Sequence, residues 1–387
     1  LHLGSRVGNI QLSTDNSVHR FSVQNSSQLW NGQCRWLIDA SGRSSMLAKQ
    51  ENLRIPESHH SVAAVWGRFR NVVNLDEIGP DSFRQRVNGT SRRESTTHFC
   101  YPGYWIWFIP ISQDIVSVGI VMERSAGWQN HLHKKEGFVD FLQQHHAPWS
   151  LLQKAELLDL GSFQHLPYRT RQYFSQHRWG LTGESAAFTD PFYSPGSDFI
   201  ALENDFLTNL IRHEENGTSS QHLHHLVNLS NAYMHFRYDA SMYLYRDLYS
   251  LFGSYELLKL KFQLDLPLYY HIWLSEFMQD QHLDEDFLTN QVQEQQQVLN
   301  ALSTFSQLFQ KVERHLQKNK AMYRGNLGNF TDALEGIGWI GEVGQLMTPE
   351  QSLTRLRTIF ARGFEQANGL LEIRSHDTID QTHLANS

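Results

Sequence analysis

Several strand-like patterns of apolar and polar positions occur in the first 125 residues of the chain. Residues 7–24 alternate on either side of a Thr-Asp-Asn-Ser turn, which predicts two short strands. Longer strand-like runs cover 60–73, 95–111 and 114–123. Because the side chains of a strand point to alternate faces, these runs indicate a mostly antiparallel sheet over about residues 60–123.

Helical spacing of apolar residues replaces this alternation further along the chain. Residues 135–158 fit helices, and residues 178–213 predict a strand, a loop and a long helix with Ser197 as its N-cap. From about residue 220 to 375 the pattern is helical almost throughout. The exception is 321–350, where glycines indicate a loop.

An aromatic stripe marks the first of these C-terminal helices. Tyr238, Met242, Tyr245 and Tyr249 recur at helical spacing, which favours a buried core face. The wall of a substrate pocket is the alternative interpretation. The stretch LPLYYHIW at 266–273 is a second candidate for such a wall.

The composition of the 387 residues excludes several classes of protein. Apolar residues make up 40% and the net charge is −7 without a basic block, so a nucleic-acid partner is not expected. Apolar runs of about eight residues are far shorter than the ~20 that a membrane span needs. Two cysteines, Cys34 and Cys100, favour a reducing, cytoplasmic setting. The 21 histidines follow no metal-ligand pattern, so no metal site is expected.

The stretch LIDASGR at 37–43 ends an apolar strand in a small-residue turn. Asp39 is followed by Ala40, Ser41 and Gly42, and such small residues let a ligand approach the backbone closely. An ordinary β-turn would have the same composition. By itself, this stretch leaves both interpretations open.

A second small-residue loop, at 183–196, connects a strand to the long helix. The N-terminus of that helix faces the loop, where free N–H groups favour an anionic or electron-rich ligand group. A plain helix-capping loop is the alternative. The candidate binding residues in this loop are Gly183, Glu184, Ala187, Asp190, Pro191, Ser194, Pro195 and Gly196.

Two tryptophans lie two residues apart in the stretch WIWFIP. Trp105 and Trp107 share one face of a strand, where they either fill a core or wall a cavity that holds a flat ring. Together with Ile109 and Pro110 they match WxWxIP, and the chain thereby resembles the flavin-dependent halogenases, a group within the FAD-dependent monooxygenases. The two small-residue stretches are similar to the flavin motifs of that family and occur in the same order. The resemblance spans roughly residues 1–275.

This resemblance implies an α/β (α+β) flavoprotein with an FAD-binding, Rossmann-like part. Residues 1–215 would form a partial FAD-binding domain, and 216–387 a helical region beside the substrate. A partner flavin reductase would supply reduced FAD, and the enzyme would use O2 with chloride or bromide. Its substrate would be an electron-rich aromatic compound, either a small molecule or one bound to a carrier protein.

The resemblance also implies roles for individual residues. Trp105 and Trp107 would wall the flavin compartment. The halide and the flavin edge would lie beside Ser194, Pro195 and Gly196. The remaining FAD contacts would come from Asp39, Ala40, Ser41, Gly42, Gly183, Glu184, Ala187, Asp190 and Pro191.

Several positions depart from the family pattern. Glu184 replaces an aspartate, Pro195 replaces a serine or threonine, and Tyr193 stands where tryptophan halogenases carry an indole-orienting glutamate. A phenol, a pyrrole or another electron-rich ring is therefore a better expected substrate than free tryptophan. A related FAD monooxygenase that does not halogenate is one alternative function, and an inactive fragment is another.

The N-terminal part of the family fold is not found in this sequence. No strand–GxGxxG–helix unit precedes Asp39, and the family's catalytic lysine would also lie upstream. With Leu1 as the first residue, we expect a chain that lacks its N-terminal βαβ unit. The stretch GIGWIG at 336–341 satisfies GxGxxG but lacks a βαβ context, so a glycine-rich loop is the better interpretation.

Overall fold

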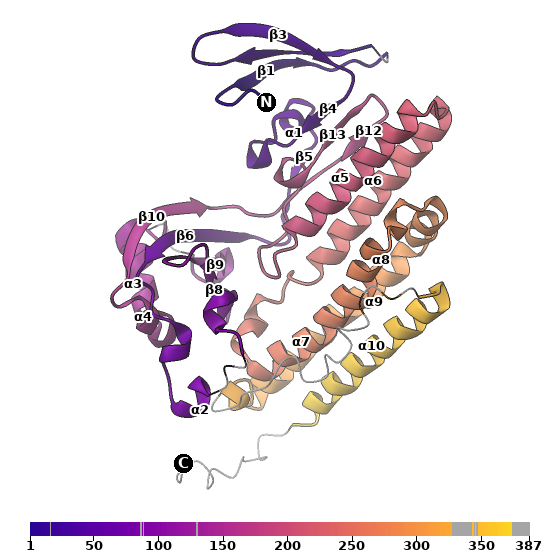
Figure 1. The fold of residues 1–387 in the computed structure, drawn as a ribbon. Helices are drawn as coiled ribbons and strands as arrows, with labels where there is room; N and C mark the ends of the chain where they lie inside the picture. Colours follow the sequence, from indigo (N-terminus) through magenta and orange to yellow (C-terminus); the bar gives the residue numbers. More distant parts are fainter. Residues whose placement is uncertain are drawn as a thin grey trace.

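The computed structural model describes residues 1–15, 17–85, 87, 89–128, 131–326, 343, 345 and 347–373. An N-terminal meander and a small mixed sheet lie at one end, with a larger antiparallel sheet to one side and a stack of long helices to the other (Figure 1). The mixed α/β architecture with a helical C-terminal region matches the sequence-based expectation. The absence of an N-terminal βαβ unit and the division at residue 215 stay predictions.

The first three strands form an antiparallel meander. They are β1 (Arg6–Gln11), β2 (His19–Gln24) and β3 (Leu29–Cys34). The first two are the strands predicted on either side of the turn. The third was missed, because its residues mix apolar and polar types without clear alternation. It is held by β2, in a register that pairs His19 with Cys34.

A small mixed sheet brings two distant parts of the chain together. Its strands, in spatial order, are β12 (Phe174–Ser175), β13 (Trp179–Leu181) and β4 (Leu37–Asp39). The last two run parallel, with Leu37 beside Trp179 and Asp39 beside Leu181. Both small-residue stretches therefore leave the same edge of this sheet, where ligands bind in open α/β sheets.

Short elements follow each of these two strands. After β4 come the 3-10 turn η1 (Gly42–Ser44) and helix α1 (Met46–Gln50), and after β13 comes the turn η5 (Gly183–Ser185). Strand β5 (Arg54–Pro56) pairs with β11 (Tyr168–Thr170) beside them. These pieces fix the loops that contain the predicted cofactor residues.

The antiparallel sheet predicted over about residues 60–123 is confirmed, with one more strand added to it. One of its faces is covered by α3 (Lys135–Gln143) and α4 (His146–Leu152), through contacts with Ile106 and Phe108. The opposite face carries Trp105 and Trp107. The strands, in spatial order, are β10 (Glu156–Phe163), β6 (Val62–Arg70), β9 (Ile115–Glu123), β8 (Tyr104–Pro110) and β7 (Thr97–Tyr101).

The helical prediction for 135–158 was wrong at its C-terminal end. Residues 156–163 form strand β10 and pair with β6, although their leucines also fit helical spacing. Gly161 lies opposite Trp66, and a Cβ there would come within 2.8 Å of the indole ring. Pairing with the edge of β6 decides the conformation, and local spacing does not reveal that edge.

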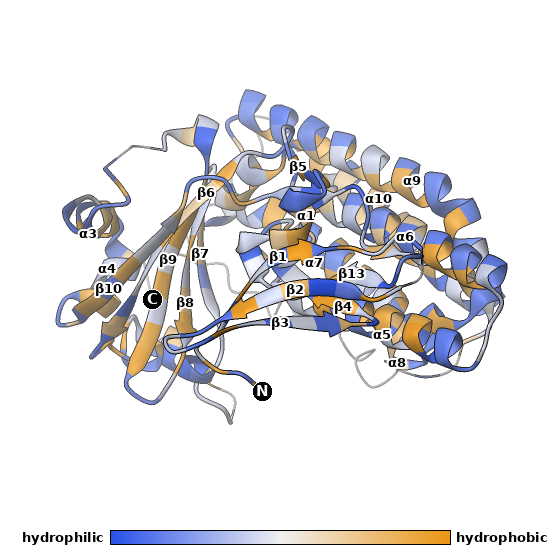
Figure 2. Ribbon diagram, turned by 90° about the horizontal axis from the view of Figure 1, so that it is seen from above, coloured by the Kyte–Doolittle hydropathy of each residue, from blue (hydrophilic) through white to orange (hydrophobic). Residues whose placement is uncertain are grey.

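Long helices make up the C-terminal half, as predicted, and they alternate apolar and polar residues along their length (Figure 2). The segment Tyr269–Leu274 is a π-helix that follows Pro267 in α7. The α-helices of this half are α5 (Gly196–Glu215), α6 (Ser220–Met242), α7 (Tyr255–Leu268), the short α8 (Ser275–Met278), α9 (Glu285–Lys318) and α10 (Pro349–Leu371). Short α2 (Asp81–Arg84) lies near the large sheet.

Two smaller expectations have different outcomes. Helix α5 begins at Gly196 with Pro195 in the N-cap position, so the prediction of Ser197 as the N-cap was wrong by two residues. The GIGWIG stretch at 336–341 lies outside the described residues. Within the described part of the chain, no helix is both long and apolar enough to cross a membrane.

Candidate active site

The carboxylate of Asp39 is used inside its own turn. Its Oδ1 accepts a hydrogen bond from the N–H of Ser41 at 2.8 Å, and its Oδ2 accepts one from the N–H of Leu47 at 2.7 Å. The backbone carbonyl of Asp39 accepts from the N–H of Thr182 at 3.0 Å. These bonds hold η1 against η5, and a direct contact of Asp39 with a cofactor stays a prediction.

Arg43 connects the two small-residue stretches. Its Nη1 lies 3.4 Å from Oε2 of Glu184, and its Nη2 donates to the carbonyl of His165 at 2.8 Å. Its guanidinium also lies 4.4 Å from the ring centre of Phe163. The side chain of Glu184 stays 41% exposed, so it is held in place but open to a ligand. Arg43 lies within LIDASGR but was not predicted as a site residue.

A left-handed glycine and a buried carboxyl lie at the start of η5. Gly183 has a φ of +61°, and its N–H donates to Oε2 of Glu203 on α5. Glu203 is fully buried, and its Oε1 has no hydrogen-bond partner among the described residues. Burial raises the pKa of this carboxyl well above its usual value. No sequence signal marks Glu203, because it lies within α5, beyond the end of the motif.

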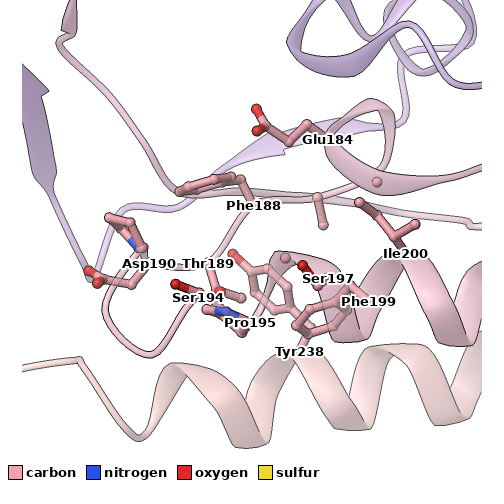
Figure 3. A pocket seen from close by; sticks show the side chains of 14 residues that line it. Glu184, Phe188, Thr189, Asp190, Ser194, Pro195, Ser197, Phe199, Ile200 and Tyr238 are labelled. Atoms are coloured by element: carbon pink, nitrogen blue, oxygen red, sulfur yellow. The ribbon is translucent and has the colours of Figure 1, made fainter. Parts of the chain in front are cut away.

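A cavity of about 310 Å³, called cavity 1, lies in front of the loop 183–196. Glu184 and Phe188 lie on one side of it, and Ser194 and Pro195 lie across from them near Tyr238 of α6 (Figure 3). The predicted residues that line it are Gly183, Glu184, Ala187, Asp190, Pro191, Ser194, Pro195 and Gly196. Asp39, Ala40, Ser41 and Gly42 are not among its lining residues.

Helix α5 starts at the edge of cavity 1 with free backbone donors. The N–H groups of Gly196 and Ser197 make no hydrogen bond to any described residue. A Cβ on Gly196 would meet no atom within 4 Å, so a ligand can approach its backbone. Tyr193 and Ser194 just before them hold φ values of +67° and +54°, which are strained for side chains of their type.

These features fit the flavin part of FAD. Free N–H groups at a helix N-terminus suit the electron-rich edge of a flavin ring or a halide ion. The carboxylate of Glu184 can accept hydrogen bonds from sugar-like hydroxyls. Glu184, Gly196 and Ser197 are therefore the residues that would hold the cofactor on this side. No group of three or more potential metal ligands occurs in the part of the chain that the structure describes.

Asp190 holds the middle of the loop 183–196 in place through buried hydrogen bonds. It is 1% exposed and accepts hydrogen bonds from the N–H of Phe192 at 2.8 Å, from the hydroxyl of Tyr249 at 2.7 Å and from His60 Nε2 at 2.7 Å. The indole of Trp105 donates to the same Tyr249 hydroxyl at 3.1 Å. One carboxylate thus ties the loop to the large sheet and to the segment after α6.

The tryptophan pair packs behind this loop. Trp105 is 2% and Trp107 9% exposed, their ring centres are 5.7 Å apart, and Phe192 lies 5.2 Å from the ring of Trp105. Neither residue lines cavity 1. The contact with Phe192 places the pair one layer behind the loop. Its role as a wall of the flavin compartment stays a prediction.

A second cavity of about 280 Å³, called cavity 2, adjoins cavity 1. Ser194, Pro195 and Phe199 line both cavities. The stretch 266–273 forms part of its wall, as one of the sequence-based interpretations had it. Its other aromatic and apolar lining residues are Tyr193, Leu202, Leu244, Tyr245, Leu266, Tyr269, Tyr270 and Trp273.

Charged groups in cavity 2 were not found from the sequence. Asp198, Arg237 and Asp265 line it and come from three different helices. Arg237 is 6% exposed, its guanidinium lies 4.5 Å from the ring centre of Trp273, and its Nε has no hydrogen-bond partner among the described residues. Burial raises the pKa of Asp198, which accepts a hydrogen bond from Tyr269 at 3.1 Å.

Comparison with curated proteins supports the resemblance that the sequence motifs indicated. It is 25% identical over 280 residues to the flavin-dependent halogenase chlA of Dictyostelium discoideum, covering 70% of this chain and 45% of chlA. It is 29% identical over 183 residues to the tetracycline 7-halogenase of Kitasatospora aureofaciens, covering 42% of this chain and 31% of that enzyme. This chain is a homologue of the flavin-dependent halogenases. It spans less than half the length of these two curated relatives.

Solved halogenase structures share the fold of this homologue. Halogenase PltM in complex with phloroglucinol and FAD has a TM-score of 0.59 at 14% identity, covering 94% of this chain and 69% of PltM. The flavin-dependent halogenase CmlS has a TM-score of 0.51 at 18% identity, covering 93% of this chain and 55% of CmlS. No protein-family model matches the chain.

Proposed function

We propose that this halogenase homologue takes part in FAD-dependent halogenation of an electron-rich aromatic compound. Reduced FAD and O2 would supply the oxidant that turns chloride or bromide into hypohalous acid, with a flavin reductase as the partner that reduces the cofactor. The chain's own residues would hold the flavin and the halide in cavity 1 and the aromatic ring in cavity 2.

The observation that carries this proposal is a pair of neighbouring cavities of different character. They share Ser194, Pro195 and Phe199, and one has free N–H donors at its edge while the other has aromatic walls. In a hydroxylating flavoenzyme the flavin must meet the substrate directly. In a halogenase the flavin and the substrate occupy different compartments, because only a small oxidised halogen passes between them. Two neighbouring cavities, one suited to each, therefore support halogenation over hydroxylation.

Within cavity 1 the proposed tasks divide by position. Glu184, held by Arg43, would accept hydrogen bonds from the ribityl or ribose hydroxyls of the cofactor. The N–H groups of Gly196 and Ser197, together with the positive end of α5, would hold an anion or the polar edge of the flavin. Asp190 would position the loop and would not react, because other side chains and the backbone occupy both of its oxygens.

The expected activity can be tested by product mass. The purified protein is supplied with FAD, a flavin reductase, NADH and air, with chloride, bromide or no halide, and with phenols or tryptophan. We expect a halogenated phenol with the isotope pattern of the added halide, and little product from tryptophan. A hydroxylated product that forms equally without halide would show that the monooxygenase alternative is right, and no product at all would favour the inactive-fragment alternative.

Two Gly→Ala variants, one beside cavity 1 and one remote from it, add a test and its matched control to this assay. Neither Gly196 nor Gly369 of α10 has an atom within 4 Å of an added Cβ, so both Gly→Ala variants should fold. In Gly196→Ala the new methyl enters cavity 1 beside the free donors, so we expect at least about a tenfold loss of halogenation, one hydrogen bond to an anion being worth that much. Gly369→Ala should keep the wild-type rate.

A further inference from the structure

Asp265 of α7 is a buried carboxylate with one oxygen left without a partner. It is 6% exposed and lines cavity 2. Its Oδ2 accepts from the hydroxyl of Tyr193 at 2.9 Å and from Nζ of Lys261 at 2.7 Å. Its Oδ1 makes no hydrogen bond to any described residue. Because Asp265 lines cavity 2, a ligand there can donate a hydrogen bond to the oxygen that has no protein partner.

The surrounding charges indicate what kind of donor fits. Lys261 is 1% exposed and neutralises Asp265, so the pair does not need a cationic ligand. Arg237 adds a second buried cation to the lining of the cavity, and Asp198 adds an acid. A ligand ammonium group would be repelled by Lys261 and Arg237, whereas a neutral O–H group would not. The chemistry therefore favours a hydroxyl.

The shape of cavity 2 indicates the group that carries this hydroxyl. Tyr245, Tyr269, Tyr270 and Trp273 contribute aromatic rings to its wall, and Pro195 contributes an apolar pyrrolidine ring. Aromatic walls favour a planar ring with apolar faces. A volume of about 280 Å³ suits a single substituted ring.

From these observations we propose that cavity 2 binds a phenol, whose hydroxyl donates its hydrogen bond to Oδ1 of Asp265. This inference rests on the proposed function and narrows its substrate from an electron-rich aromatic to a phenol. Accepting the hydrogen bond draws electron density into the ring, which favours attack by an electrophilic halogen at positions beside and opposite the hydroxyl.

The pKa of Asp265 is consistent with this role. Burial raises it above its ordinary value, and the charge of Lys261 and the hydroxyl of Tyr193 act in the opposite direction. A carboxylate with a raised pKa is the stronger hydrogen-bond acceptor. The pKa of the donor Tyr193 is raised well above its usual value, mainly by burial, so it stays a neutral phenol itself.

Two probes that differ by one methyl group test the hydroxyl. 4-Nitrophenol has an O–H, and 4-nitroanisole carries a methyl ether in its place. Their binding to the full protein is followed by absorbance titration without cofactor turnover, at a mildly acidic pH that keeps the nitrophenol protonated. We expect wild-type protein to prefer the phenol by about tenfold or more, as for a hydrogen bond to a charged group. Equal affinities, or no binding of either probe, would overturn the proposal.

Two variants assign the preference to Asp265. In Asp265→Asn the acceptor loses its charge, and we expect the preference for nitrophenol to fall to about threefold or less while nitroanisole binding is unchanged. This variant leaves Lys261 buried without a charged partner and could unfold. The double variant Lys261→Met with Asp265→Leu replaces the whole pair by apolar side chains, which buried ion pairs commonly tolerate, and should abolish the preference.

A control variant and a parallel assay complete the test. Asp81→Asn alters an acid whose side chain is 74% exposed and should keep the full preference for the phenol. A preference that persists in the double variant would show that Asp265 is not the acceptor. If the wild type distinguishes the probes but yields no halogenated product, the proposed function fails and this inference stands. If it halogenates phenols without distinguishing the probes, only this inference fails.

Discussion

At the scale of single residues, the tightest requirement in the large sheet comes from an indole ring lying over a glycine. Trp107 and Gly119 are opposite each other on β8 and β9. A Cβ on Gly119 would come within 2.2 Å of the Trp107 ring. Packed interiors accept little extra volume, so the position of the ring depends on the missing side chain.

Gly119→Ala should therefore destabilise the protein, by about 1–3 kcal/mol in the free energy of unfolding. Chemical denaturation measures this change. Gly8→Ala on β1 is the matched control, because its Cβ would meet only Ser22 Oγ, at 3.8 Å, an ordinary contact. That variant should lie within about 0.5 kcal/mol of wild type. If both variants unfold alike, Trp107 is not packed as described.

At the scale of elements, the loop before α5 owes its position to one acid. Asp190 receives donors from the loop itself, from His60 just before β6 and from Tyr249 in the segment after α6. Those three parts lie far apart in the sequence. Losing one acceptor would leave buried donors unsatisfied on more than one of them.

The variant Asp190→Asn keeps the size of the side chain but replaces one acceptor oxygen by a donor group. We expect it to cost about 1–3 kcal/mol of stability, measured by thermal or urea unfolding. Asp114→Asn is the control. Its side chain is 64% exposed and lies 3.7 Å from Arg70, so its loss should cost less than about 0.5 kcal/mol. An equal loss of stability in the two variants would show that Asp190 does not hold the loop in place.

Which of these elements the sequence could predict depends on how local their signal is. The strands around Trp105, the long helices and most of the residues of 183–196 that line cavity 1 followed from spacing or motif. Strand β10 did not, because only its pairing with β6 separates it from a helix. Glu203 and Asp265 were missed for a similar reason. Each is an acidic residue on a helix, and its burial depends on tertiary packing that the local sequence does not show.

At the scale of the whole molecule, the helical half carries a buried acid that makes its stability depend on pH. Glu276 of α8 is 8% exposed. Burial raises its pKa to about 7 from 4.5, and the charge of Arg237 opposes this shift. The folded state therefore holds a proton that the unfolded state releases above about pH 4.5. The stabilisation is complete below that pH and is lost as the pH rises to about 7.

Comparison with Glu276→Gln separates this contribution from all other titrating groups. Relative to the glutamine variant, the wild type should become less stable between pH 4.5 and 7 by about 3 kcal/mol, and then stay level. Urea unfolding of both proteins at pH 5, 6, 7 and 8 measures the difference. Parallel curves across this range would show that Glu276 titrates as an exposed acid does.

The parallel pairing of β4 with β13 has a consequence for how such a protein can change over generations. Asp39 and Leu181 are neighbours on this sheet, yet the whole antiparallel sheet lies between them in the sequence. The ends of that long segment meet at fixed points, so the connections between its strands can vary in length without moving the loops on which cavity 1 depends. Insertions and deletions in those connections cost little, since loop-closure entropy grows slowly with length. Lineages can therefore change the connections of the large sheet while the ends of β4 and β13 stay in register.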